Sequence, residues 1–377
     1  MSDLEYNPYA FSLHEDPYQT YRRLRDDAPA FWNDELRFWA LSRFDDVHGA
    51  FRDHETYISS HGIALETRTD HREGVAMLIE TDPPEHTVLR KLVSRVFTGR
   101  KVAEMQSTAR EIVTGYIDAF IGDGCCDLVG DLSGPFPMDV ISEVLGVPES
   151  DRADLRRFAD KILIREDGSA EMPEEAAQGI FDMLSYFAAD LPSRKAGEGT
   201  GLFTDLAQVE VDGRRLTNDE LVGFCLLFVV AGHETTTKMI ANAVELLSRH
   251  PEQRNEVTAD ATLVPDVVEE VLRFHNSTQY MHRTLSRDIT MHDQEMRSGQ
   301  SVLLLIGAAN HDEREFGPTA EAFDIHRRAE RHLAFGYGAH FCLGAALARM
   351  EGLVALDRKS TRLNSSHPSK SRMPSSA

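Results

Sequence analysis

The stretch of sequence that says most about the fold is Phe335-Gly336-Tyr337-Gly338-Ala339-His340-Phe341-Cys342-Leu343-Gly344. Its first two glycines permit a tight loop, because glycine adopts positive φ values without steric cost. Cys342 follows at the start of a predicted helix, LGAALARME. The free N–H groups and the dipole at a helix N-terminus favour a thiolate over a thiol. The stretch therefore predicts a cysteine thiolate presented at the end of a glycine loop.

Cys342 and Gly344 together suit one kind of ligand. Gly344 has no side chain, so the helix that follows can lie close against a flat molecule. A thiolate on a shelf of small residues suits axial ligation of haem iron, where it favours cleavage of the O–O bond. The alternative is a structural cysteine buried at a helix start, which is the commoner role of an isolated cysteine. The residues that surround Cys342 favour the haem ligand.

The segment resembles the haem-binding loop of the cytochrome P-450 superfamily, whose pattern FGxGxHxCxG it matches at each fixed position. The resemblance extends from about residue 5 to about residue 356 and is closest to soluble bacterial members. It implies a mainly α fold with small β-sheets, in which a single domain contains a long central helix that crosses the distal face of the haem. It also implies haem b (iron protoporphyrin IX) as the cofactor and Cys342 as the ligand of its iron. In the same loop, the resemblance implies cofactor contacts from Phe335, Gly336, His340 and Gly344.

The long central helix is visible in the sequence. Thr217 to Glu220 match a capping box just before an apolar run. The helical pattern continues to His250 and stops at Pro251, a length of nearly 50 Å at about 1.5 Å per residue. Its first half, LVGFCLLFVV, is apolar on every face, so we expect it to be buried all round.

A polar patch, AGHETTT, interrupts this apolar helix at residues 231–237. Gly232 weakens the helix and leaves room for a ligand, and threonine hydroxyls can disturb the backbone hydrogen bonds. The patch resembles the family's AGxxT oxygen-binding groove, which implies a cofactor contact at Ala231 and Gly232. The resemblance also implies a catalytic acid–alcohol pair, Glu234 and Thr235, that supplies protons to reduced dioxygen. The alternative is a polar kink that satisfies its own hydrogen bonds.

A second motif, Glu270-Val271-Leu272-Arg273, matches the family's ExxR. The i to i+3 spacing places the carboxylate and the guanidinium on one face of a helix. By itself such a pair is usually a solvated surface contact. The resemblance implies that it meets a further arginine, here Arg327, and braces the core on the haem side without a catalytic role.

Haem carries two propionates, which need cationic or hydrogen-bonding partners. The family pattern implies four such partners: His86 and Arg90 on the helix after Pro83-Pro84, Arg283, and His340. All four positions hold a suitable residue. Isolated histidines usually lie at the surface, and the chain has 16 of them, so this inference depends on position alone.

Helices and strands are expected elsewhere from hydrophobic periodicity. Phe31–Ser42 alternates like a hairpin around Asn33-Asp34, and strand-like segments follow His275. We expect helices at 43–54, 101–122, 135–145, 151–164, 173–191, 265–274 and 343–356, and a flexible loop at 192–201.

The chain of 377 residues shows no internal repeat and no clear linker, so we expect one cytochrome P-450 domain over residues 1–356. Family members continue past the cysteine helix with a closing β segment, whereas here DRKSTRLNSSHPSKSRMPSSA follows Leu356. Seven of the last 20 residues are serine and almost none is apolar. We therefore interpret residues 357–377 as a disordered tail, open to a non-native origin, where the C-terminal part of the domain is missing.

The formal net charge of −22 argues against binding to nucleic acids or to anionic membranes. The N-terminus lacks the plan of a signal peptide, and no apolar run reaches the roughly 18 residues that span a bilayer. Only four cysteines occur, without a CxxC pair, which is typical of a reducing cytoplasm. We expect a cytoplasmic protein.

By resemblance, the chain is expected to be a monooxygenase that hydroxylates or epoxidises a hydrophobic small molecule with O2. A lipid, steroid, terpenoid or polyketide would suit its apolar helix. No flavin or nicotinamide motif is fused to the chain, so a ferredoxin with its reductase is the expected electron donor. The basic run at 326–332 is a candidate for part of the docking face. The pocket is expected to draw on residues 61–80, 160–200, 224–235 and 276–280.

Three other functions remain open at this point. A cysteine hydrolase would use Cys342 as its nucleophile, but His340 is two residues away and no oxyanion site stands out. A zinc protein would need ligand spacings that His326, His332 and His340 do not show. A non-catalytic haem sensor or carrier would share the cysteine loop but would not need the groove of Glu234 and Thr235.

Overall fold

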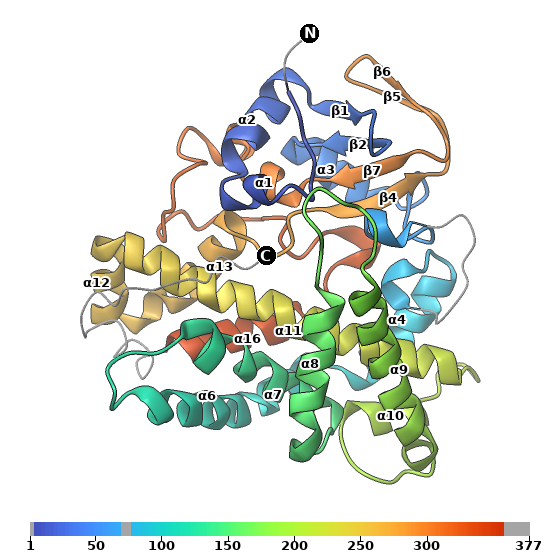
Figure 1. Ribbon diagram of the computed structural model, residues 1–377, viewed down its shortest axis with the longest axis vertical. Coiled ribbons are helices and arrows are strands. Elements are labelled where there is room, and N and C mark those ends of the chain that lie inside the picture. The colour runs from blue at the N-terminus through green and yellow to red at the C-terminus, as the bar shows by residue number, and fades with distance from the viewer. Residues whose placement is uncertain (1–3, 69–76, 358–377) are drawn as a thin grey trace.

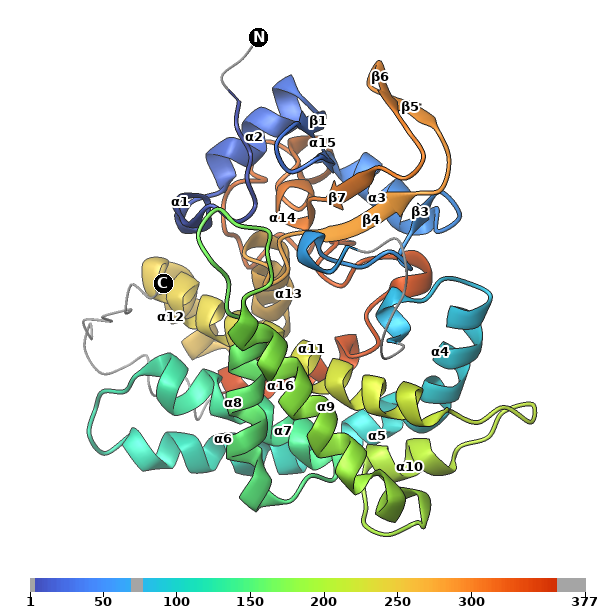
Figure 2. The ribbon, with the colours of Figure 1, turned by 45° about the vertical axis from the view of Figure 1, so that its right-hand side comes forward.

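The computed structural model describes residues 4–68 and 77–357. A smaller part, built around a sheet, lies against a larger helical part, and the turned view shows the same division (Figures 1 and 2). The expected mainly α fold with small sheets is confirmed. The tail expected at 357–377 lies, from residue 358 onward, outside the described residues.

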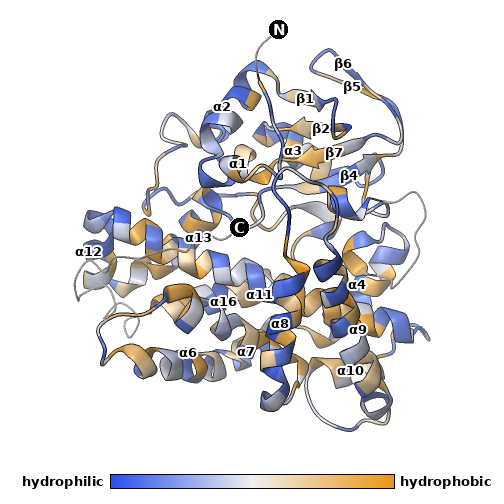
Figure 3. Ribbon diagram, viewed as in Figure 1, coloured by the Kyte–Doolittle hydropathy of each residue, from blue (hydrophilic) through white to orange (hydrophobic). Residues whose placement is uncertain are grey.

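The main sheet has the strand order β1-β2-β7-β4-β3. These strands are β1 (Ala30–Asn33), β2 (Phe38–Leu41), β3 (Tyr57–Ile58), β4 (Met281–Leu285) and β7 (Ser301–Leu304). Strands β2 and β7 run parallel, and the other neighbours run antiparallel. The pairing of β1 with β2 confirms the hairpin expected at 31–42. Strands β2 and β7, which lie inside the sheet, are mostly apolar (Figure 3).

A separate hairpin joins β5 (Ile289–Met291) to β6 (Gln294–Met296). The helices are α1 (Phe11–Glu15), α2 (Tyr18–Asp27), α3 (Phe44–Arg52), α4 (Glu85–Val96), α5 (Gly99–Glu104), α6 (Gln106–Phe120), α7 (Pro135–Leu145), α8 (Arg152–Ile162), α9 (Glu174–Lys195), α10 (Leu202–Gln208), α11 (Asn218–Arg249), α12 (Pro251–Ala259), α13 (Val264–Phe274), α14 (Ile306–Ala309), α15 (Glu313–Phe316) and α16 (Ala345–Leu356). Short helical turns are η1 (Leu65–Thr67), η2 (Leu78–Glu80), η3 (Leu128–Ser133), η4 (Glu149–Asp151), η5 (Ala261–Leu263) and η6 (Gly338–His340).

Helix α11 confirms the capping box at its first turn. Thr217 Oγ1 accepts a hydrogen bond from the Glu220 N–H (3.2 Å), and Glu220 Oε2 accepts one from the Thr217 N–H (2.7 Å). The expectation that its first half is buried all round is wrong at Leu227, Phe228 and Val230, which are only partly buried. Leu227 and Phe228 line a cavity, so the apolar run serves a ligand as well as the core.

Two helix boundaries differ from the expectation. The helix expected at 101–122 is two helices, α5 and α6, that meet at Met105. Helix α9 continues through Pro192 to Lys195, so the loop expected at 192–201 begins later. Arg194 explains the extension, because it is buried and bonds Asp190 Oδ2 (2.6 Å) within the helix and the Gly146 carbonyl (2.9 Å) outside it.

No helix within the described part of the chain is both long enough and apolar enough to cross a membrane.

Candidate active site

A cavity with an empty volume of about 1450 Å³, part of it open to solvent, lies between α11 and α16. The cysteine loop, α4 and β4 complete its wall. Its lining includes most of the residues predicted from the sequence: His86, Arg90, Ala231, Gly232, Thr235, Arg283, Phe335, Gly336, His340, Cys342 and Gly344. Segments that lie far apart in the chain therefore meet at one site.

Cys342 lies just before the first turn of α16, with its side chain on the cavity. Its sulfur accepts hydrogen bonds from the backbone N–H groups of Gly344 and Ala345. Burial nevertheless raises the pKa of the Cys342 thiol, against the lowering effects of these N–H groups and of the Arg90 and Arg349 cations. The helix N-terminus thus does not hold a thiolate unaided, and a bound metal cation would supply what it lacks.

Each glycine of the loop is needed for a different structural reason. Gly336 and Gly338 have φ values of +64° and +69°. A Cβ on Gly338 would lie 2.6 Å from the Phe51 carbonyl oxygen, so a side chain there would clash with α3. A Cβ on Gly344 would approach only the Cys342 sulfur, at 3.9 Å. The space left by the missing Gly344 side chain therefore opens toward the cavity.

Four nitrogen-bearing side chains gather on one wall of the cavity. The rings of His86 and His340 lie with their centroids 4.2 Å apart, and His86 Nε2 is buried without a hydrogen-bond partner. Arg90 donates to the carbonyls of Ala339 (3.1 Å) and Phe341 (2.6 Å). Arg283 is buried and donates to the carbonyl of the preceding residue.

The charges of this cluster favour an anionic ligand. Burial lowers the pKa of His86 to about 4 and that of His340 to about 2, so both rings are neutral near pH 7. Burial lowers the pKa of Arg283 to about 10, which leaves the guanidinium charged at pH 7. Within residues 4–68 and 77–357, neither Arg90 nor Arg283 has a carboxylate within ion-pair distance. A buried arginine, Arg283, and a partly buried one, Arg90, neither of them in an ion pair, match the two propionates of haem.

The polar patch of α11 lies opposite, with Thr235 and Thr236 on the cavity. Thr235 Oγ1 donates to the Ala231 carbonyl (2.6 Å), the kind of bond that loosens a helix. Glu234 is absent from the described lining, and its carboxylate lies 2.8 Å from Lys238 Nζ. The structure thus brings Thr235 to the site but not the acid expected beside it, because successive helical residues face different sides.

Gly232 also differs in part from its expected role. A Cβ there would lie 3.2 Å from Ile141 Cδ1 and Cγ1 on α7. That distance is tighter than most real Cβ contacts, so Gly232 allows α11 and α7 to pack closely. Gly232 lines the cavity, yet the space saved by its missing side chain lies toward α7.

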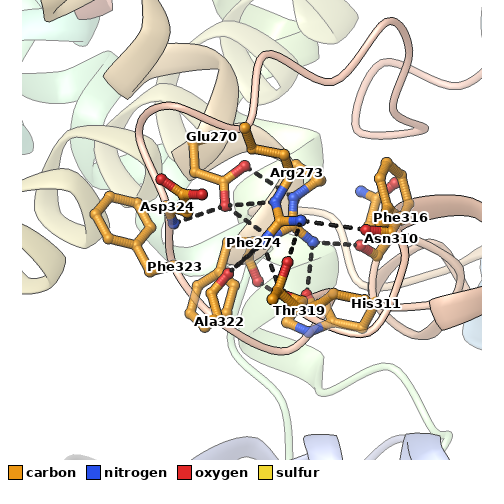
Figure 4. Close-up of polar contacts among 12 residues, drawn as sticks. Glu270, Arg273, Phe274, Asn310, His311, Phe316, Thr319, Ala322, Phe323 and Asp324 are labelled. Carbon is orange, nitrogen blue, oxygen red and sulfur yellow. Dashed lines mark hydrogen bonds and ion pairs between the residues drawn. The ribbon is translucent and has the colours of Figure 1, made fainter.

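Glu270, Arg273 and Arg327 meet beside α13, as the resemblance implied. Figure 4 shows the contacts between Glu270 and Arg273. Arg273 forms two bonds with Glu270, at 2.8 and 2.7 Å, and Arg327 Nε lies 3.2 Å from Glu270 Oε1. None of the three lines the cavity. Their contacts are structural, since they tie α13 to the chain segment that leads into the cysteine loop.

The basic run at 326–332 is not a free positive patch. Each of its basic residues lies beside a carboxylate: His326 with Glu256, Arg327 with Glu270, Arg328 with Asp266, Arg331 with Glu315, and His332 with Glu269. The excess positive charge expected there is therefore neutralised locally.

Sequence reasoning also missed part of the cavity wall. Residues 160–200 contribute nothing to the described lining, and residues 69–76 of the expected 61–80 region lie outside the described chain. The missed lining residues include Phe51, Phe97, Ile141, Leu272, Met281, Ile306 and Glu351. They carry no motif, and only the packing of distant elements brings them together.

The residues present fit haem. The cavity is lined by a cysteine sulfur with two N–H donors at one end of α16, by small residues on both helices, and by two arginines that form no ion pair within the described residues. These residues suit a flat molecule that carries two carboxylates and an iron atom able to bind a thiolate.

Comparisons with known proteins agree with this geometry. A family model described as Cytochrome P450 matches residues 190–359. The putative cytochrome P450 123 of Mycobacterium tuberculosis (strain ATCC 25618 / H37Rv) is 41% identical over 94% of this chain and 89% of its own. The cytochrome P450 monooxygenase PikC of Streptomyces venezuelae is 36% identical over 90% of this chain and 82% of its own. The structure of CYP109E1 from Bacillus megaterium in complex with corticosterone is similar at a TM-score of 0.80 and 30% identity, covering 90% of this chain and 88% of that one.

Proposed function

Because the chain belongs to the cytochrome P450 family, and is thus an oxidoreductase that incorporates oxygen from O2, we propose that it binds haem b through Cys342 and oxidises a neutral hydrophobic small molecule. Hydroxylation and epoxidation both belong to this proposal. The single observation that carries it is the position of the Cys342 sulfur at the N-terminus of α16, on the same cavity as the four-residue cluster of His86, Arg90, Arg283 and His340.

The residues of this chain would hold the haem at both its centre and its edge. Cys342 would ligate the iron, and Arg90 and Arg283 would bind the propionates with charge-assisted hydrogen bonds. His86, with its unpartnered Nε2, and His340 would donate further bonds. When bound, the group supplies the redox chemistry that activates O2. Ala231, Gly232, Phe335, Gly336 and Gly344 line the same cavity and would contact the macrocycle.

On the side of α11, the Thr235 hydroxyl would hold a water molecule that passes protons into the cavity. It can do so because its own proton is committed to the Ala231 carbonyl, which leaves its oxygen free to accept a bond. Glu234 would join such a relay only after leaving Lys238, so its catalytic role has less support than that of Thr235.

The part of the cavity wall that lies outside the four-residue cluster indicates the class of substrate. Apolar side chains cover it: Leu78, Ile79, Phe224, Leu227, Phe228 and Met281. Among the described lining residues, the arginines are Arg90 and Arg283 of the cluster, and the one carboxylic acid is Glu351. This wall would exclude a free carboxylate and accept a steroid, terpenoid, polyketide or other neutral lipid. The related CYP109E1 structure contains corticosterone, a molecule of this class.

We propose a ferredoxin with its reductase as the electron source, as the resemblance implies. The neutralised run at 326–332 gives no electrostatic support to docking at that particular segment. The four cysteines are free in the structure, which suits a reducing cytoplasm.

The test is turnover with isotopically labelled O2, a ferredoxin, its reductase and a panel of neutral steroids and terpenoids. The proposal predicts products that contain one labelled oxygen atom, while the second atom appears in water. A protein that binds haem but transfers no label to any neutral substrate would be a sensor or carrier. A protein that binds no haem but hydrolyses esters would restore the cysteine hydrolase.

A further inference from the structure

We propose that Ser277 is a positioning residue for Thr235, because its hydroxyl group holds the turn of α11 from which the Thr235 side chain reaches the cavity. This inference rests on the proposed monooxygenase function and adds to it a residue from outside α11 that acts through Thr235.

Ser277 lies in the segment that joins α13 to β4, and it lines the same cavity as Thr235. Its Oγ donates a hydrogen bond to the backbone carbonyl of Thr235 at 2.6 Å, across 42 residues of sequence. A carbonyl oxygen has two lone pairs, so a donor from outside the helix can bind it and disturb the regular ladder of helix bonds. The bond therefore acts on the backbone of α11 at the residue whose hydroxyl serves the cavity.

A similar bond lies one helical turn earlier. Thr235 Oγ1 donates to the Ala231 carbonyl at 2.6 Å, and both residues line the cavity. Residues four apart share one face of a helix, so two successive carbonyls on this face each have a hydroxyl partner. The first bond orients the Thr235 side chain, and the bond from Ser277 fixes the backbone from which that side chain extends.

The segment that carries Ser277 is itself held in place. Asn276 Nδ2 donates to the Thr278 carbonyl, and Gln279 Nε2 donates to the Asn276 carbonyl at 2.6 Å. The Gly307 N–H, on α14, donates to the Gln279 carbonyl at 3.0 Å. These bonds limit the movement of Ser277, so its hydroxyl is a fixed point against which α11 is positioned.

A second bond joins the same two segments at a place away from the cavity. Asn242, about two turns beyond Thr235 on α11, donates from its Nδ2 to the His275 carbonyl at 2.8 Å. Neither Asn242 nor His275 is among the described lining residues. Asn242 therefore provides a matched control, because its loss removes a connection between these segments without removing a bond to the Thr235 backbone.

The position of Thr235 matters for the fate of the electrons. One O2, two electrons from the ferredoxin, two protons and one substrate molecule give one oxidised product and one water. When proton delivery through the water at Thr235 fails, the same two electrons and two protons leave with O2 as hydrogen peroxide. Loss of the Ser277 bond should therefore shift the outcome from product to peroxide.

The first test measures the ratio of hydrogen peroxide to product in the haem-loaded protein, with the neutral steroid or terpenoid that is oxidised in the turnover test. We expect Ser277→Ala to raise this ratio about ten-fold, within the loss of up to about 100-fold that a misplacement of about 1 Å can cause. Ser277→Thr keeps a hydroxyl and should restore most of the coupling. Asn242→Ala should leave the ratio unchanged.

A double-mutant cycle tests whether Ser277 acts through Thr235. In a Thr235→Val background, Ser277→Ala should raise the ratio no further. An unchanged ratio in Ser277→Ala, an equal rise in Asn242→Ala, or a full further rise in the Thr235→Val background would overturn the inference. Weaker substrate binding in Ser277→Ala with an unchanged ratio would make Ser277 a substrate contact instead, which also overturns it.

The second test needs no turnover. The C–O stretching frequency of carbon monoxide bound to the reduced, haem-loaded protein responds to the polar groups of the cavity. We expect Ser277→Ala to shift this infrared band, Ser277→Thr and Asn242→Ala to keep it, and Ser277→Ala to leave it unchanged in the Thr235→Val background. An unshifted band in Ser277→Ala alone would overturn the inference. Absence of any turnover in the unaltered protein would instead contradict the proposed function, and the infrared bands would still decide whether Ser277 positions Thr235.

Discussion

Arg273 and Glu270, one turn apart on α13, form a two-bonded ion pair that is closed to solvent. The guanidinium is 0% and the carboxylate 3% exposed. The other N–H groups of Arg273 reach the carbonyls of Asn310 (2.7 Å), Ala320 (2.9 Å) and Ala322 (3.2 Å). The pair therefore fixes the path of the segment that leads into the cysteine loop (Figure 4).

Glu270→Gln should destabilise the fold strongly. It leaves the Arg273 charge buried without a counterion, and breaking one side of a buried pair costs about 3–5 kcal/mol. The measurement is the free energy of unfolding by urea. The matched control is Asp154→Asn, because Asp154 and Arg157 form an i,i+3 pair at 2.8 Å with both side chains more than half exposed. That control should cost less than about 1 kcal/mol. Equal losses in the two variants would contradict the role given to the buried pair.

His311 should make the fold sensitive to mild acid. Its ring lies between Tyr18 and Phe274, and burial lowers its pKa to about 3. The unfolded chain takes up a proton near pH 6.5, which the folded chain cannot do, so stability falls as the pH drops from about 6.5 toward 3. Between pH 6.5 and 5 the loss should be roughly 2 kcal/mol. His311→Gln keeps a donor for the Phe274 carbonyl and should reduce this slope by the share of one histidine, because His86 and His340, whose pKa values burial also lowers, contribute to the rest. An unchanged slope in the variant would show that His311 contributes nothing to the acid sensitivity.

Gly232→Ala tests whether the missing side chain serves helix packing. Alanine favours a helix by about 1 kcal/mol over glycine, but its Cβ would press on Ile141 at 3.2 Å. We expect no gain in thermal stability from Gly232→Ala alone, and a gain when the same change is made in an Ile141→Val background. A double-mutant cycle of melting temperatures measures this coupling. If the two substitutions change the melting temperature additively, Ile141 does not restrict the side chain at position 232.

Arg283→Gln should weaken haem retention without removing the thiolate ligand. One charge-assisted hydrogen bond contributes about 1.5–3 kcal/mol, so haem loss should accelerate about ten-fold to a hundred-fold. Transfer of haem to an excess of apomyoglobin gives the rate. The equivalent surface change, Arg287→Gln, removes a cation that is 63% exposed and should leave the rate unchanged. Identical rates in both variants would remove Arg283 from the propionate site.

Much of this site could be predicted because local sequence determines it. The cysteine loop depends on glycines with positive φ, and the start of α11 depends on the capping box at Thr217 and Glu220. Packing determines which face of a helix meets a cavity, so sequence alone could not show that Glu234 turns to Lys238. Glu351 carried no signal, because a buried acid and a solvated acid look the same in a helical pattern.

The pairing of distant segments explains the remaining differences. Only the folded chain shows that the basic run at 326–332 meets acidic residues from other elements, such as Asp266 on α13 and Glu315 on α15. Likewise, the end of α9 depends on Arg194 reaching the Gly146 carbonyl, a contact across 48 residues of sequence.

Ligation of haem through Cys342 is the central claim, and the carbon monoxide difference spectrum of the dithionite-reduced protein tests it most directly. The account predicts a strongly red-shifted Soret band, the mark of a thiolate opposite carbon monoxide, and its loss in Cys342→Ala. A purified protein without this band, or a Cys342→Ala variant that retains it, would contradict the account.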